Sequence, residues 1–204
     1  MSAIAKRKAP QPVSVGELGI VGDEQADRHV HGGRDKAVHL YSWLHYEKWR
    51  QELPTCRVLN EAGAFGENLS VLGVDEFGVC IADRWRVGTV ILEVSQGRQP
   101  CWKLNLRFGL QDMATRVQQS IRAGWYCRVV KPGRLTAGDA MELLDRPYPL
   151  WSVSRLLALI RDRECERTTM DEVLALPLTP SWRRLFTRRR ELSTVEDWER
   201  RLVE

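Results

Sequence analysis

Short apolar runs separated by polar and glycine-rich turns make up most of the chain, a pattern typical of β-strands. Apolar positions with helical spacing occur from Ser42 to Pro54 and from Gly109 to Ala123. Many short, irregularly spaced strands favour a closed or nearly closed β-barrel over a βαβ repeat. The expected strands lie at residues 13–20, 37–41, 69–72, 79–81, 86–87, 89–94, 124–130 and 140–144.

The pattern changes after Pro147-Tyr148-Pro149, where helix signals replace strand signals. Ser152 can cap a helix and Pro180 can open another. Thr169–Glu172 and Ser193–Glu196 have the form of capping boxes. We therefore predict a mainly β fold with added α-structure. It consists of a β-barrel domain at residues 1–148 and a small C-terminal helical bundle, of about four short helices, at residues 149–204.

Charge and hydrophobicity favour a protein that binds an anionic ligand and does not span a membrane. The 204 residues carry a net charge of +4, which suits an anionic ligand but is too weak to indicate nucleic acid by itself. No apolar run approaches the roughly 18 residues of a membrane span, and the basic start has no apolar signal-peptide core. We therefore expect a cytoplasmic protein without a membrane partner. No G-x-G-x-x-G fingerprint occurs, so a redox enzyme of this sequence would take its electrons from another protein.

Cys101 is the cysteine with the most distinctive surroundings. The five cysteines are widely spaced and lack a CxxC pair, which suggests neither a disulfide scaffold nor a metal cluster. An apolar strand leads to Cys101, Pro100 precedes it, and Arg98 and Lys103 lie close by. Nearby cations lower the pKa of a thiol, so Cys101 could be a nucleophile or a ligand for a soft metal. A small buried cysteine at the end of a strand fits the same pattern.

The segment His-Gly-Gly-Arg-Asp-Lys at residues 31–36 could hold an anion. Glycines let backbone N–H groups approach an anion closely, and Arg34 and Lys36 add positive charge. His31 could donate a proton near neutral pH. A solvated turn between strands is the simpler alternative.

Two further clusters give weaker signals. His29 and His31 could bind zinc together with His39 or Cys101, although no second cysteine is paired by spacing. The arginine-rich stretch at residues 183–190 could bind nucleic acid, but acidic residues follow at once. Solvated helix faces are the better interpretation of this stretch, so a nucleic-acid partner is not expected.

Several ordered motifs extend over nearly the whole chain. They are Ser2–Lys6, Gly22–Ala26, Val30–Gly33 with Asp35–Ala37, Ala64–Leu69, Val94–Gln96 with Arg98, Pro100–Cys101 and Lys103–Leu104, Gly124–Trp125 and Trp182–Arg190. Together these motifs resemble those of the MOSC domain family, and within it the YiiM-like proteins. The resemblance implies a MOSC-type β-barrel followed by a C-terminal helical bundle.

The resemblance also implies a chemistry. Cys101 would be a sulfur ligand of molybdenum in a pyranopterin molybdenum cofactor. The protein would reduce N-hydroxylated compounds such as 6-N-hydroxylaminopurine to amines, with electrons from an external reductase. Catalytic roles would fall to Cys101 and to two candidate proton relays, His31 and Asp35. The residues implied in cofactor binding are Lys6, Gly32, Gly33, Arg34, Lys36, Asn68 and Arg98.

Alternatives to the reductase stay open. Cys101 could carry sulfur as a persulfide, in a sulfur carrier or sulfurtransferase, or the protein could bind the molybdenum cofactor without catalysis. The family has also been linked to pyridoxal phosphate. Family members usually have further residues before the segment that matches Ser2–Lys6, so either a first strand is missing or the start site is assigned late. We therefore expect an open barrel edge, a poorly fixed Lys6 and a possible homodimer. Proline is common in the family where this chain has Gly97, so we expect a looser loop before Arg98.

Overall fold

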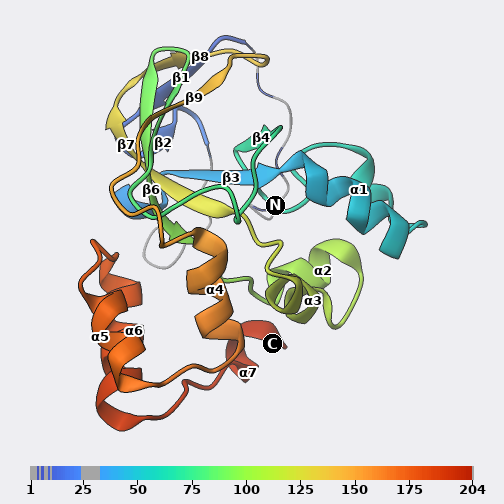
Figure 1. Cartoon of the computed structure of the whole chain (residues 1–204). Coiled ribbons are helices and arrows are strands. Elements are labelled where there is room, and N and C mark those ends of the chain that lie inside the picture. Colours follow the sequence, from blue (N-terminus) through green and yellow to red (C-terminus); the bar gives the residue numbers. More distant parts are fainter. Residues whose placement is uncertain (1–3, 5, 7–8, 10, 24–32, 204) are drawn as a thin grey trace.

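The computed structural model describes residues 4, 6, 9, 11–23 and 33–203, and its strands form two sheets (Figure 1). The larger sheet has the strand order β4-β3-β7-β6-β5-β9, and the smaller has the order β2-β1-β8. The strands are β1 (Val13–Gly16), β2 (Gly19–Ile20), β3 (Val38–Ser42), β4 (Leu69–Val71), β5 (Arg84–Val87), β6 (Val90–Gly97), β7 (Trp125–Lys131), β8 (Gly133–Leu135) and β9 (Met141–Asp145).

The antiparallel pair of β6 and β7 forms the centre of the larger sheet. β3 pairs antiparallel with the other edge of β7 and parallel with β4, while β5 joins β6 to β9. The sheet curls into a half-barrel, and helices follow it in the chain. The predicted class, a MOSC-type β-barrel architecture followed by C-terminal helices, is confirmed.

Four strand predictions need correction. The single strand expected at residues 13–20 is a pair of antiparallel strands, β1 and β2. Residues 79–81 form only an isolated bridge, between Cys80 and Ser152. β6 continues past the expected end at Val94, because Gln96 and Gly97 still pair with β7 after an irregularity in register. β8 lies between the strands expected at 124–130 and 140–144, where no strand was predicted, and its three residues pair with β1.

Helices flank the sheet and fill the C-terminal part of the chain (Figure 1). They are α1 (Trp43–Glu52), α2 (Lys103–Phe108), α3 (Met113–Ser120), α4 (Val153–Arg161), α5 (Arg167–Leu174), α6 (Pro180–Leu192) and α7 (Glu199–Leu202), with the 3-10 turns η1 (Arg34–Lys36) and η2 (Arg57–Asn60). Within the described ranges, no helix is long and apolar enough to cross a membrane.

The helix starts predicted at Ser152 and Pro180 are confirmed. The Ser152 side chain accepts a hydrogen bond from the Arg155 N–H, and Pro180 begins α6. Both predicted capping boxes are wrong. Glu166 caps α5 instead, because its carboxylate accepts bonds from two backbone N–H groups of the first turn, and Ser193 ends α6 in the left-handed conformation.

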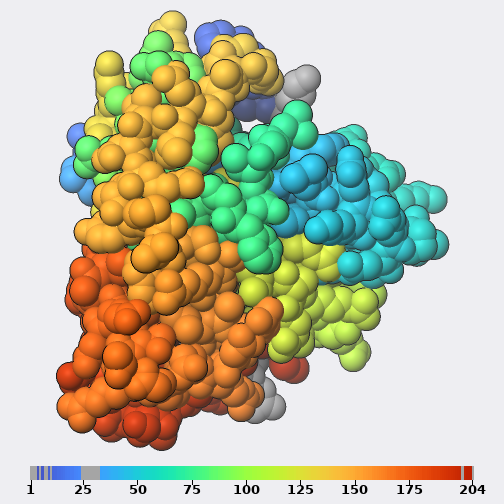
Figure 2. All heavy atoms as spheres, in the orientation of Figure 1, coloured from blue at the N-terminus to red at the C-terminus, as the bar shows by residue number. Residues whose placement is uncertain are grey.

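Helix α4 packs directly on β6, and the C-terminal helices share one continuous surface with the rest of the chain (Figure 2). The Gln96 side chain, at the end of β6, accepts a hydrogen bond of 2.7 Å from the Thr179 hydroxyl at the start of α6. A Cβ atom at Gly97 would lie 2.8 Å from the Cγ of Leu157 in α4. Gly97 therefore belongs to a strand closely covered by a helix. The expected loose loop is wrong at this position.

Arg189 of α6 fastens the C-terminal segment to the helices. Its side chain has no exposed surface, and it pairs with Glu196 at 2.9 Å. Its guanidinium also donates to the carbonyl oxygens of Leu159, Ile160 and Glu164. The interpretation of residues 183–190 as solvated helix faces is therefore wrong for Arg189, which serves the packing of the helices.

Replacing Arg189 by methionine should destabilise the fold. The change leaves three carbonyl groups and the partly buried Glu196 without their donor, so the free energy of unfolding should fall by about 3 kcal/mol or more. Urea denaturation of Arg189→Met measures the loss, and Arg188→Met, at an exposed position of the same helix, is the matched control. Equal stabilities of the two variants would contradict this account.

Candidate functional site

Cys101 lies in the short connection between β6 and α2. β6 ends at Gly97, and α2 begins two residues after the cysteine, at Lys103. The Cys101 carbonyl oxygen accepts a 3.0 Å hydrogen bond from the Leu104 N–H in the first turn of α2. The residue is partly buried, and its sulfur is in no disulfide. The sheet and the helix thus fix the backbone on both sides of the thiol.

Arg98 is the first residue of this connection, and it is buried. Its exposed fraction is 5%, and its backbone N–H donates to the Gly124 carbonyl oxygen at 3.0 Å. The guanidinium lies close enough to Tyr126 to act against the rise in the pKa of that phenol, and its Nη1 atom has no hydrogen-bond partner. Among the residues that the structure describes, no carboxylate forms an ion pair with Arg98. Burial of an unpaired cation is costly, so this group is suited to an anion.

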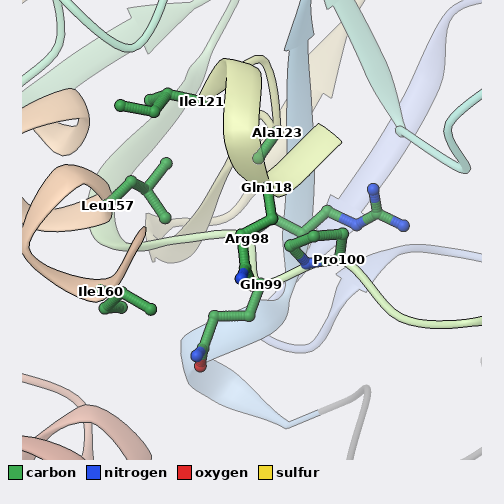
Figure 3. A pocket seen from close by; sticks show the side chains of 8 residues that line it. All are labelled: Arg98, Gln99, Pro100, Gln118, Ile121, Ala123, Leu157 and Ile160. Atoms are coloured by element: carbon green, nitrogen blue, oxygen red, sulfur yellow. The ribbon is translucent and has the colours of Figure 1, made fainter. Parts of the chain in front are cut away.

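Figure 3 shows which way this arginine points. The Arg98 guanidinium extends away from Leu157 and Ile160, which come from α4 on the other side of the connection. Its backbone therefore borders a small apolar pocket, while its charge lies on the side of Tyr126 and His39.

His39 and Tyr126 lie side by side next to Arg98. They are paired residues of β3 and β7, with ring centroids 5.0 Å apart. Burial lowers the pKa of His39 to about 3, and the positive charges of Arg98 and Lys6 add to the shift. The imidazole is therefore neutral at physiological pH. Burial raises the pKa of Tyr126, so this side chain keeps its proton.

Lys36 approaches the same place from η1. Its ammonium nitrogen lies 5.9 Å from the centre of the Tyr126 ring, within range of a cation–π contact. Burial lowers the pKa of Lys36, and the neighbouring Asp35 opposes that shift. Together with Arg98, this lysine places two cations around the ring of Tyr126.

Lys6 and Asn68 meet at Asp23. Lys6 forms an ion pair with Asp23, whose other carboxylate oxygen accepts a 2.8 Å hydrogen bond from the Asn68 amide. The Asn68 side-chain oxygen accepts a hydrogen bond from the backbone N–H of His39, also at 2.8 Å. Lys6 is thus held by an ion pair, and the expectation that it would be poorly fixed is wrong. Both ends of the Asn68 side-chain amide are engaged, and its role in cofactor binding stays a prediction.

The remaining predicted residues are less closely connected with Cys101. Asp35 pairs with Arg128 at 2.9 Å, and its carbonyl oxygen accepts a bond from the Ser95 hydroxyl. Arg34 is exposed and pairs with Glu17 at 2.5 Å. Gly33 precedes η1 with a φ of 91°, which suits glycine. His31 and Gly32 lie outside the described residues, as does His29, so the roles predicted for this loop remain predictions.

Two neighbours of the site, Tyr126 and Arg201, lie outside the sequence motifs, and a third, Asp23, lies in the Gly22–Ala26 motif without a predicted role. Tyr126 reads as an ordinary strand residue. Arg201 contacts the connection from the far end of the chain. His39 gives a weak signal, as a polar residue within a buried strand. Only the fold brings these side chains together.

The site combines a partly buried thiol with two cations near one aromatic ring, one of which is the buried Arg98 guanidinium with a free donor. These features fit an anionic group that also contains a soft metal, because the thiolate is a soft ligand and the guanidinium favours phosphate. The residues present therefore fit a phosphate-bearing metal cofactor.

The family models agree with this geometry. The model of the MOSC domain matches residues 27–142, which include β3 to β7 and Cys101. The chain belongs to the MOSC domain family. A second model, of a YiiM-like 3-alpha helix domain, matches residues 151–192, where α4, α5 and α6 lie. The resemblance inferred from the motifs is thus confirmed.

Individual MOSC proteins are similar over most of the chain. Protein YiiM of Escherichia coli is 38% identical over 98% of this chain and 90% of its own length. Its crystal structure superposes with a TM-score of 0.87, covering 98% of this chain and 94% of that one at 33% identity. A protein named "Reductase" from Gibberella moniliformis is 42% identical over 87% of this chain, which spans only 32% of that protein's length. None of these names supports pyridoxal phosphate binding.

The low pKa of His39 predicts how stability depends on pH. A histidine that is neutral when buried takes up a proton on unfolding below its ordinary pKa of 6.5. Its contribution to stability is therefore complete above that pH and declines as pH falls towards 3, by at most about 1.4 kcal/mol per pH unit.

Urea denaturation at pH 7, 6 and 5 measures this slope. The variant His39→Gln, which cannot titrate, should show a flatter dependence than the wild type over the same range. Parallel curves for the two proteins would show that His39 takes up its proton in the folded state.

Proposed function

We propose that this MOSC protein is a molybdenum cofactor-dependent reductase of N-hydroxylated compounds, with Cys101 as a ligand of the metal. The observation that carries the proposal is the buried Arg98, which begins the connection that holds the cysteine and whose Nη1 has no hydrogen-bond partner. An anionic cofactor would supply the missing partner. When bound, the cofactor would supply two-electron chemistry at molybdenum.

The chain's own residues have separate tasks in this proposal. Cys101 provides a soft thiolate, and Arg98 and Lys36 hold negative charge on the side of Tyr126. Lys6 adds positive charge near His39. The cations of this cluster are candidates to hold the cofactor's phosphate. Asp35 and His31 remain candidate proton relays.

The proposed reaction balances with an external electron donor. A compound R–NHOH takes up two electrons and two protons, its N–O bond breaks, and R–NH₂ and water are formed. The electrons come from a separate reductase protein, because the sequence has no dinucleotide fingerprint. The substrate is a small N-hydroxylated molecule such as 6-N-hydroxylaminopurine.

We also propose the domain division between residues 148 and 149. The ranges matched by the two family models end at 142 and begin at 151, which supports a boundary in this segment. The proposed location of the protein is the cytoplasm, where a reductase partner would be available.

Replacing Cys101 by alanine should abolish both metal retention and activity. The protein is purified from a host that makes the molybdenum cofactor, and metal is measured per chain. Reduction of 6-N-hydroxylaminopurine is followed with a reduced viologen dye as donor. We expect about one molybdenum per wild-type chain and at least a hundredfold loss of activity in Cys101→Ala, because the metal loses its protein ligand.

Cys165→Ala is the matched control, since Cys165 is also partly buried but lies between α4 and α5, in the C-terminal helical region. It should behave as the wild type. A wild-type protein without molybdenum, but with cyanide-releasable sulfur on Cys101, would contradict the proposal and support a persulfide carrier. Bound molybdenum without turnover would support the non-enzymatic binding module.

A further inference from the structure

The C-terminal helix α7 contacts the Cys101 connection on both sides of the cysteine. The Trp102 N–H donates to the Arg201 carbonyl oxygen at 2.7 Å, and the Arg201 Nη1 donates to the Pro100 carbonyl oxygen at 2.6 Å. One residue of α7 therefore binds the backbone immediately before and immediately after Cys101. Arg201 and Pro100 are about a hundred positions apart in the sequence, so only the fold brings them into contact.

Arg201 is itself held from two directions. Its Nη2 atom donates to the Gln118 side chain of α3 at 2.5 Å. The neighbouring Leu202 is buried, and its carbonyl oxygen accepts a 2.7 Å bond from the Asn105 side chain of α2. Asn105 in turn accepts from the Ala114 N–H at the start of α3. These bonds tie α7, α2 and α3 into one unit around the cysteine.

A small pocket borders the connection on another side. It is lined by Arg98, Gln99 and Pro100 of the connection and by apolar side chains that include Leu157 and Ile160 of α4 (Figure 3). No described residue of α7 lines this pocket, so the hydrogen bonds from α7 are a separate support of the connection.

The Arg201 side chain keeps its positive charge next to Cys101. Burial lowers the pKa of Arg201 to about 10, and the neighbouring Glu196 and Cys101 act in the opposite direction. The guanidinium is therefore still charged at neutral pH. The thiol of Cys101 is close enough to interact with it electrostatically.

We propose that Arg201 is a positioning residue, which holds the Pro100–Trp102 backbone so that the Cys101 sulfur stays in place to bind its ligand. Arg201 acts through the backbone and needs no contact with substrate or cofactor. The inference rests on the proposed function in one respect, namely that Cys101 is the functional thiol. It extends the site to a segment beyond the residues 151–192 matched by the helical family model.

Amide hydrogen exchange of the cofactor-free protein tests the contact. In Arg201→Gln, exchange at the Trp102 amide should rise at least tenfold, while the amides that pair β6 with β7 stay unchanged. Arg201→Lys keeps a donor for one of the two acceptors and should give an intermediate rate. Arg200→Gln, at an exposed position of the same helix, should leave exchange at wild-type values.

A second measurement separates positioning from structural support. Molybdenum release from the loaded protein should be at least tenfold faster in Arg201→Gln and partly restored in Arg201→Lys. Unchanged exchange at Trp102, an equal rise at all amides, or unchanged metal release despite faster exchange would overturn the inference. If the wild type holds no molybdenum, the proposed function fails, and the exchange rates alone decide whether Arg201 fixes this backbone.

Discussion

A guanidinium group that is largely out of water, with no carboxylate partner in the described part of the chain, is the constraint on which the site depends. Removing an arginine charge from water costs several kcal/mol unless another group compensates. The protein places the Arg98 guanidinium beside Tyr126, a phenol that stays protonated and therefore brings no negative charge. It also keeps the adjacent His39 neutral, which avoids a second positive charge. The arrangement leaves an electrostatic deficit that an anion would remove.

The C-terminal helices also contact the segment that carries the site. Because Gly97 has no side chain, Leu157 of α4 can pack closely against the end of β6. The Gln96 side chain is hydrogen bonded to Thr179 at the start of α6. α7 then reaches the backbone around Cys101 through Arg201. Arg189 fastens the segment that leads to α7. The position of the thiol therefore depends on contacts from both halves of the chain.

The sequence predicts the fold class because strand and helix patterns are local. The helix start at Ser152 follows from a side chain that bonds within its own first turn. Capping at Thr169 fails because the helix begins earlier: Glu166 accepts from the backbone N–H groups of Thr168 and Thr169, so Thr169 already lies within the first turn. β8 escapes prediction because a three-residue strand with glycine resembles a turn until its partner β1 is known.

The site is less predictable because its geometry comes from long-range contacts. The cysteine and the arginine before it can be read from one short motif. The burial of Arg98, the pairing of His39 with Tyr126 and the contact from Arg201 depend on registers and packing that no local pattern encodes. Asp23 shows the same limit, since it joins Lys6 to Asn68 across distant segments.

X-ray absorption at the molybdenum edge tests the central claim, that the Cys101 sulfur binds the metal. The measurement counts the sulfur atoms around molybdenum in the loaded wild type and in whatever metal Cys101→Ala retains. The account predicts one sulfur neighbour more in the wild type than in the variant. Equal sulfur counts, with metal retained at equal occupancy, would show that Cys101 is not a ligand.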